Sequence, residues 1–177
     1  MKRLLLGTFV LSSLLYGTVV TRPMLSGVER LFKGSLESLF TPDQLFGMLD
    51  SPQGVYIEGF GVVLTARVNL VEAPGLMPFR PALKPEEIKS IRDRKIERLP
   101  IVRDAMRHSM MLAAGMIETV PMDEQFVYSV VLFHHTYEDA KGIPTQIVMQ
   151  ASRKTLLALQ RQPDKAALAT AIKMREF

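Results

Sequence analysis

The residues from Val62 to Leu70 alternate between apolar and polar side chains, and this alternation limits the choice of fold more than any other feature of the sequence. Apolar side chains recur at every second position, and Thr65, Arg67 and Asn69 stand between them. A period of two residues places the apolar side chains on one side of a strand and the polar ones on the other. The chain therefore contains a half-buried strand, which requires a sheet with a second layer on one face.

Two further strands are predicted at residues 125–138 and 145–151, and residues 172–177 could form an edge strand. The connection at residues 139–142 contains a glycine, which favours an antiparallel hairpin. The segment Gly59-Phe60-Gly61 precedes the alternating strand. It lacks the third glycine of a dinucleotide fingerprint, and a strand follows where a helix is needed, so we expect a bend or bulge with a close backbone approach.

A long helix is predicted from Pro85 to Thr119, with a kink near Pro100. Apolar residues recur at intervals of three to five along it, so that one side of the helix faces the sheet. Short helices are expected within residues 28–49, a turn at 50–54, a proline-rich loop at 73–85 and a helix at 153–160. The predicted fold is α+β: a mostly antiparallel sheet of about three to five strands packed against one long helix, preceded by a hydrophobic N-terminal helix.

The first 22 residues are predicted to be a signal peptide or an uncleaved membrane anchor. Lys2 and Arg3 precede 18 uncharged residues that end at Arg22. A basic start followed by an apolar run is the layout of a secretory signal, and a run of this length also just reaches the span of a membrane helix. The alternative is a helix buried in the folded domain. Residues 23–54 are then assigned to short helices packed on the domain and 55–177 to the α+β domain.

Composition supports a globular protein and excludes cysteine chemistry. Hydrophobic residues make up 47% and charged residues 23% of the 177, which suffices for one well-formed core. The absence of cysteine excludes disulfides, thiolate metal sites and thiol nucleophiles. The isoelectric point of about 9.5 reflects mainly the N-terminal segment, because residues 23–177 carry 19 basic against 18 acidic residues. This near balance does not favour a nucleic-acid partner.

No arrangement of residues predicts a catalytic centre, a metal site or a cofactor. His134 and His135 are adjacent on an expected strand, where neighbouring side chains point to opposite faces, and the H-E-x-x-H pattern is absent. A G-x-S-x-G nucleophile turn is also absent. The methionines near the end of the long helix, Met106 and Met110 among them, lie on its apolar stripe and are expected to fill the core.

Two sets of residues remain candidates for binding. The helix from Lys84 to Arg107 carries eight basic against five acidic residues, which could serve an anionic partner or form a solvated helix face. Its candidate residues are Lys89, Arg92, Lys95, Arg98 and Arg103. A candidate pocket would combine Arg67, His135, Tyr137 and Glu138, provided that the fold brings them together.

Three hypotheses about function follow. The first is an exported protein, periplasmic, secreted or membrane-anchored, that has no enzymatic activity and binds a protein partner or assembles with copies of itself. The second is a hydrolase-like enzyme whose site forms only in three dimensions. The third is a protein that binds an anionic polymer or a membrane surface through the basic helix. The export signal and the absence of a catalytic motif favour the first, with the membrane contacted through the N-terminal segment.

Overall fold

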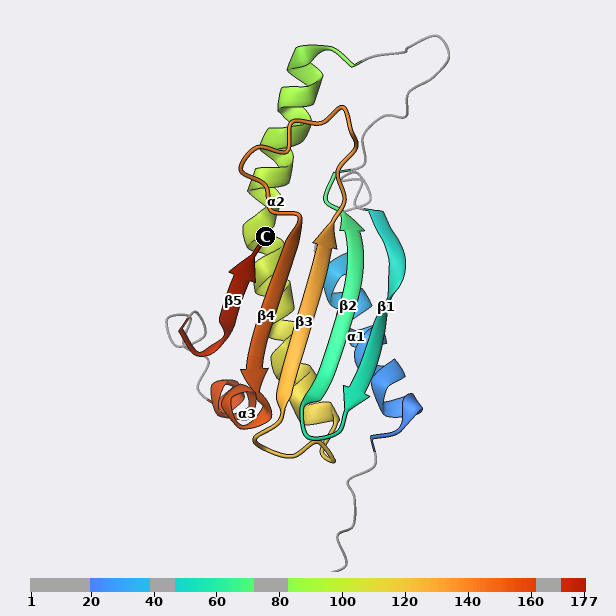
Figure 1. Cartoon of the computed structure of the whole chain (residues 1–177), viewed down its shortest axis with the longest axis vertical. Helices are drawn as coiled ribbons and strands as arrows, with labels where there is room; N and C mark the ends of the chain where they lie inside the picture. Colours follow the sequence, from blue (N-terminus) through green and yellow to red (C-terminus); the bar gives the residue numbers. More distant parts are fainter. Residues whose placement is uncertain (1–19, 39–46, 72–82, 162–169) are drawn as a thin grey trace, which may run out of the picture.

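The computed structural model describes residues 20–38, 47–71, 83–161 and 170–177 of the chain, which form an α+β fold of two layers (Figure 1). The helices are α1 (Arg22–Glu37), α2 (Pro85–Met116) and α3 (Arg153–Arg161). The strands are β1 (Gly47–Ile57), β2 (Gly61–Asn69), β3 (Gln125–Leu132), β4 (Gln146–Ser152) and β5 (Lys173–Glu176). The predicted fold class is therefore confirmed.

The five strands form one sheet in the order of the sequence, β1-β2-β3-β4-β5. The pairs β1/β2, β3/β4 and β4/β5 are antiparallel, and only the central pair β2/β3 is parallel. Parallel neighbours need a crossover connection, and α2 lies in the connection between β2 and β3. The predicted mostly antiparallel sheet, the antiparallel β3/β4 neighbours and the C-terminal edge strand are all confirmed.

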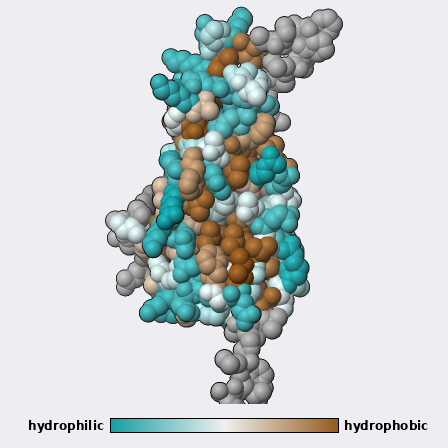
Figure 2. Space-filling view, viewed as in Figure 1, coloured by the Kyte–Doolittle hydropathy of each residue, from teal (hydrophilic) through white to brown (hydrophobic). Residues whose placement is uncertain are grey.

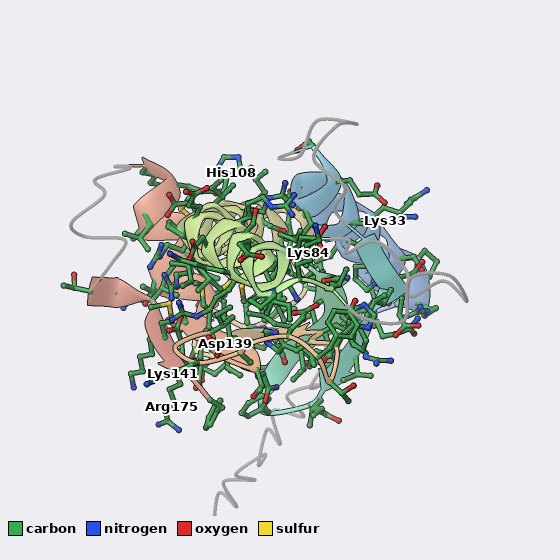
Figure 3. The ribbon with its side chains drawn as sticks, turned by 90° about the horizontal axis from the view of Figure 1, so that it is seen from above. Lys33, Lys84, His108, Asp139, Lys141 and Arg175 are labelled. Atoms are coloured by element: carbon green, nitrogen blue, oxygen red, sulfur yellow. The ribbon has the colours of Figure 1, made fainter. Side chains whose placement is uncertain are left out.

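The helices α1 and α2 lie side by side on the same face of the sheet, as the view along α2 shows (Figure 3). The alternating residues predicted to be apolar on β2 point toward them, and Val62, Leu64, Ala66 and Val68 are all buried. The equivalent face of β3 carries Tyr128, whose ring packs against Phe32 of α1 at a centroid distance of 4.7 Å. The core therefore lies between this sheet face and the two helices.

The long helix differs from its prediction in where it ends and in which side chains it buries. It ends at Met116 rather than Thr119 and runs through Pro100 without being divided. Proline is tolerated here on the exposed side of α2, although it cannot donate the backbone hydrogen bond of its turn. Ile96 is exposed, whereas its neighbour Lys95, a candidate for an anionic partner, is fully buried.

The strand β1 occupies residues 47–57, part of which was expected to form a turn. Asp50, Ser51, Pro52 and Gly54 resemble turn residues, but β1 is an edge strand, where proline is accepted. The pairing with β2 is irregular between Asp50 and Gln53, which accommodates this segment. The single helix α1 ends at Glu37. Of the second short helix expected within residues 28–49, residues 39–46 lie outside the described residues, and Gly47, Met48 and Leu49 belong to β1 instead.

The strand predicted for residues 125–138 ends at Leu132, and residues 133–145 form the connection to β4. His134 and His135 therefore lie in a loop rather than on a strand. The predicted bend at Gly59–Gly61 is present, and both glycines have positive φ angles of 74° and 129°. A Cβ atom on Gly61 would lie 2.0 Å from the carbonyl oxygen of Gln125, so the expected close backbone approach is confirmed.

Several predictions concern residues outside the described part of the chain. The apolar run of the N-terminal segment lies almost wholly in residues 1–19. Most of the proline-rich loop lies in residues 72–82. The assignment of the first 22 residues to a signal or an anchor thus stays a prediction.

Candidate interaction surface

The second face of the sheet carries side chains from all five strands and faces away from the helices (Figure 1). None of the described helices packs on it. The strand register arranges its residues in rows that run across the strands. In the order β1 to β5 these rows are Ile57, Gly61, Gln125, Ser152; then Val55, Val63, Val127, Gln150, Lys173; then Gln53, Thr65, Ser129, Val148, Arg175; and then Asp50, Arg67, Val131, Gln146. We call this surface the open face.

Apolar residues gather on one half of the open face. The rows that contain Ile57 and Val55 lie near the β1/β2 turn, and the neighbouring Val63 and Val127 continue the apolar surface toward β3. Ile57 is 50% exposed and Val55 is 54% exposed. Figure 2 shows hydrophobic surface over the lower half of this side of the molecule. Contiguous apolar surface of this kind is typical of interaction sites.

The polar residues of the open face largely bond to one another. Gln146 donates its side-chain amide to the hydroxyl oxygen of Ser129 at 2.8 Å, and Gln150 lies 3.5 Å from the amide oxygen of Gln125. Arg67 forms an ion pair with Asp50 at 3.0 Å. Covering polar groups that already have partners removes less hydration free energy than covering unpaired ones. The part of the open face that these paired residues occupy can therefore be covered at a reduced cost.

A notch interrupts the open face next to β1. It has a volume of about 310 Å³ and lies where the β1/β2 pairing is irregular. Its lining residues are Asp50, Ser51, Gln53, Thr65, Ala66 and Arg67. The notch thus offers a recess beside an exposed carboxylate.

The outer edge of β1 is occupied by side chains of α1. Glu29 accepts a hydrogen bond from the backbone N–H of Gly54 at 2.7 Å, and Arg22 donates to the carbonyl oxygen of Gly54 at 3.1 Å. The two side chains also form a bidentate ion pair. At this position they take the place of a neighbouring strand, which protects the edge from pairing with another chain. The backbone groups of Gly54 are therefore not free to pair with another chain.

Most of the candidate basic residues of α2 form hydrogen bonds or ion pairs with other segments of the same chain. Arg92 donates to the carbonyl oxygen of Lys141 through two nitrogen atoms, at 3.1 and 2.9 Å. Arg98 donates to the carbonyl oxygen of Leu70. Arg103 forms a bidentate pair with Glu176 of β5 at 2.7 and 3.0 Å. These candidates for an anionic partner bind neighbouring segments instead, whereas Lys89 is exposed on α2.

Lys95 is the most unusual member of that set, because its side chain is 1% exposed. Its ammonium group forms an ion pair with Glu138, whose side chain is 3% exposed, and donates to the carbonyl oxygen of Phe133 at 2.9 Å. Burial lowers the pKa of Lys95, and the hydrogen bond and charge of Glu138 act in the opposite direction. The pair fastens the 133–145 loop onto α2. It lies away from solvent, so we assign it to loop attachment.

The residues of the predicted pocket are only partly brought together. The rings of His135 and Tyr137 stack at a centroid distance of 4.9 Å, and the rings of Phe133 and His135 form an edge-on contact at 4.8 Å. Glu138 turns toward Lys95, and Arg67 lies on the open face with Asp50. Burial and the charge of Glu138 raise the pKa of Tyr137. The four side chains therefore belong to different local contacts.

Sequence reasoning missed the open face because its members come from five separate segments. The alternation on β2 was a usable signal, since Thr65 and Arg67 predicted a solvent-facing side. A second groove of about 600 Å³ lies between α1 and α2 and is lined in part by Arg30, Asp104 and His108. His108 faces away from the sheet on α2 (Figure 3).

Comparisons of the chain with protein-family models, curated proteins and solved structures found no match. Among the described residues, no cluster of three or more His, Cys, Asp or Glu residues could hold a metal ion. None of the helices in the described ranges has both the length and the apolar character needed to cross a bilayer.

Proposed function

We propose that this protein is an exported, non-enzymatic protein that binds a protein partner through the open face of its sheet. The observation that carries the proposal is the second face of the sheet, which no helix of the described residues covers and which has an apolar patch at Ile57, Val55, Val63 and Val127. A two-layer fold buries one sheet face, and a second face with this much apolar surface is suited to a flat protein surface. Bonding among the polar side chains reduces the cost of covering it.

Export is proposed from the N-terminal sequence alone. A basic start and 18 uncharged residues are expected to direct the chain across or into a bacterial membrane. Intact mass and cell fractionation after expression in a secreting host test this part. A shortened chain in the soluble envelope fraction would support a cleaved signal, and a full-length chain in the membrane fraction would support an anchor. A full-length cytosolic product would contradict both.

The interaction surface can be tested by photo-cross-linking in the same host. A photoreactive aromatic amino acid is placed at Val55 on the open face, and in a matched variant at Ile101 on α2, which is 40% exposed. We expect a discrete cross-linked product from position 55 and none from position 101. Both sites are exposed, so either substitution should leave the core intact. Equal products from both positions, or none from position 55, would refute the open face as the binding surface.

A further inference from the structure

We propose that this protein stays anchored by its N-terminal segment and that the end of the folded domain next to the anchor rests on the membrane, with Phe60 and Met122 in contact with lipid. This inference rests on the export part of the proposed function and adds a second membrane contact, made by the domain itself. It concerns a different surface from the open face, so the two can be tested separately.

No linker separates the predicted anchor from the folded domain. The run of 18 uncharged residues ends at Thr21, and α1 begins at Arg22. As a helix this run would rise about 27 Å, which only just matches the thickness of the hydrocarbon core. The whole run is therefore needed to span the bilayer, and Arg22 is expected at the membrane surface. The end of the domain that contains Arg22 must then lie against the lipid headgroups.

Arg22 is fixed to the body of the domain, so α1 cannot swing away from the sheet. Its guanidinium donates to both carboxylate oxygens of Glu29 at 2.8 and 3.0 Å and to the carbonyl oxygen of Gly54 at 3.1 Å. Leu25 and Val28, in the next turns of α1, are buried in the core. The start of α1 thus moves together with the sheet, and a membrane at Arg22 determines which end of the domain faces lipid.

Two connections lie at the same end of the molecule as the start of α1 (Figure 1). They are the β1/β2 turn at residues 58–60 and the connection between α2 and β3 at residues 117–124. We call this end of the molecule the proximal end. The strands run roughly along the long axis of the molecule, so they would stand upright on the membrane and leave the open face accessible from the side.

Hydrogen bonds join the three segments of the proximal end. Glu124 accepts a hydrogen bond from the backbone N–H of Gly59 at 3.0 Å, which joins the two connections. The hydroxyl of Thr119 lies 3.8 Å from the sulfur of Met24 and donates to it, which joins the α2/β3 connection to α1. The proximal end is therefore one continuous surface around the point where the anchor enters.

Large apolar side chains are exposed on this surface. Phe60 of the turn is 41% exposed, and Met122 of the α2/β3 connection is 52% exposed. Ile57, at the end of β1, is also exposed and continues the apolar surface from the turn to the open face. Aromatic and apolar side chains at the ends of loops are suited to the boundary between headgroups and acyl chains. These side chains are therefore placed where an anchored domain would meet lipid.

The charges of the proximal end indicate which lipids it fits. Glu58, Glu118 and Asp123 are exposed there, and they outnumber the nearby exposed Lys154. Excess negative charge disfavours attraction to anionic lipids, so the contact depends on the apolar side chains. The basic first turns of α2 lie at the opposite end of the molecule, because this helix of 32 residues is about 48 Å long. In this orientation the basic helix cannot reach the membrane.

The anchor makes a weak lipid contact sufficient. A few apolar side chains alone hold a protein on a bilayer only weakly and reversibly. Attachment at Arg22 makes their contact with lipid intramolecular, at a high effective concentration. The inference therefore applies to the full-length, anchored chain.

Tryptophan fluorescence of the full chain in vesicles tests the contact, because the natural sequence contains no tryptophan. Phe60→Trp reports on the proximal end, and Ile101→Trp on α2 is the matched control, since the original side chains are 41% and 40% exposed. The vesicles contain phosphatidylcholine, either ordinary or brominated near the headgroup end of its acyl chains, and bromine quenches tryptophan on contact. We expect bromination to lower the fluorescence at least about twofold in F60W and less than about 1.2-fold in I101W.

Met122→Trp is a second reporter on the other connection, and urea denaturation verifies that each variant is folded. We expect M122W to be quenched like F60W. Replacing part of the phosphatidylcholine by anionic phosphatidylglycerol is expected to leave the quenching unchanged or to weaken it. The absence of quenching in the folded variants F60W and M122W, or equal quenching in I101W, would overturn the proposal. Quenching that appears only with the anionic lipid would overturn the apolar contact.

Cell fractionation separates failure of this inference from failure of the proposed function. A full-length chain in the membrane fraction whose positions 60 and 122 are not quenched by lipid would keep the anchor and overturn the lipid contact. A shortened, soluble chain would keep export and overturn this inference. A photoreactive amino acid at position 60 that yields a protein product, without lipid quenching there, would assign the proximal end to a protein and overturn it as well. The photo-cross-link at position 55 tests the open face independently of all three results.

Discussion

At Gly61 the backbones of β2 and β3 approach so closely that no side chain fits between them. A Cβ atom would lie 2.0 Å from the Gln125 carbonyl oxygen, and the φ angle of 129° disfavours any residue with a side chain. We expect Gly61→Ala to lower the free energy of unfolding by about 3 kcal/mol or more, measured by urea denaturation.

A matched glycine in a helix supplies the control for this substitution. Gly34 lies on the exposed side of α1, and a Cβ atom there meets nothing within 4 Å. We expect Gly34→Ala to raise stability by up to about 1 kcal/mol, because alanine loses less conformational freedom in a helix. A similar loss of stability in Gly61→Ala and Gly34→Ala would contradict the claim that the close backbone approach at Gly61 excludes a side chain.

The buried Lys95 makes stability depend on pH in an alkaline range. Burial lowers its pKa below the ordinary value of 10.5, so between the two values the unfolded chain binds a proton that the folded chain does not. The contribution of Lys95 to stability should therefore rise as the pH increases through this interval. Urea denaturation of the wild type and of Lys95→Met at about pH 8 and about pH 10.5 isolates this contribution. If the wild type lost stability relative to Lys95→Met as the pH rises, this expectation would be contradicted.

The elements α1 and β1 are joined by Glu29, which bonds to both Arg22 and the backbone of Gly54. Removing its carboxylate leaves a backbone N–H and a guanidinium without that partner, so we expect Glu29→Ala to cost about 1–3 kcal/mol. The uncovered edge should also increase aggregation, measured by light scattering.

Glu37 provides the comparison on the same helix. It is exposed and lies 3.8 Å from Lys33, so Glu37→Ala should change stability by at most about 0.5 kcal/mol and leave aggregation unchanged. If E29A aggregated no more than E37A, protection of the β1 edge by Glu29 would be refuted.

The order and type of most elements could be predicted because period-two and helical patterns reflect which side of an element is buried. β1 could not, because Pro52 and Gly54 carry turn signals and their extended conformation depends on contacts with β2 and Glu29. Lys95 was assigned to an exposed face by its charge. Its spacing of four residues from both Ile91 and Leu99 placed it on the buried stripe, a signal that the charge obscured.

Across the whole molecule, contacts between residues distant in the sequence determine the features that local sequence patterns could not predict. The strand after Gln125 ends at Leu132, and Glu138 then lies against Lys95, from which it is 43 residues away. Likewise, the open face combines residues from five strands, so its apolar patch exists only after the register is set. Local sequence identifies the solvent-facing side of one strand but does not identify its neighbours.

The parallel pairing of β2 with β3 has a consequence for the order in which the protein folds. These central strands flank the whole of α2 in the sequence, whereas β1 and β2 are joined by a tight turn at Glu58–Phe60. Closing the longer segment loses more chain entropy, so the β1/β2 hairpin and α2 should form before the sheet is completed. On the ribosome, the inner edge of β2 would stay unpaired until β3 emerges, which makes this interval the one in which a chaperone is most useful.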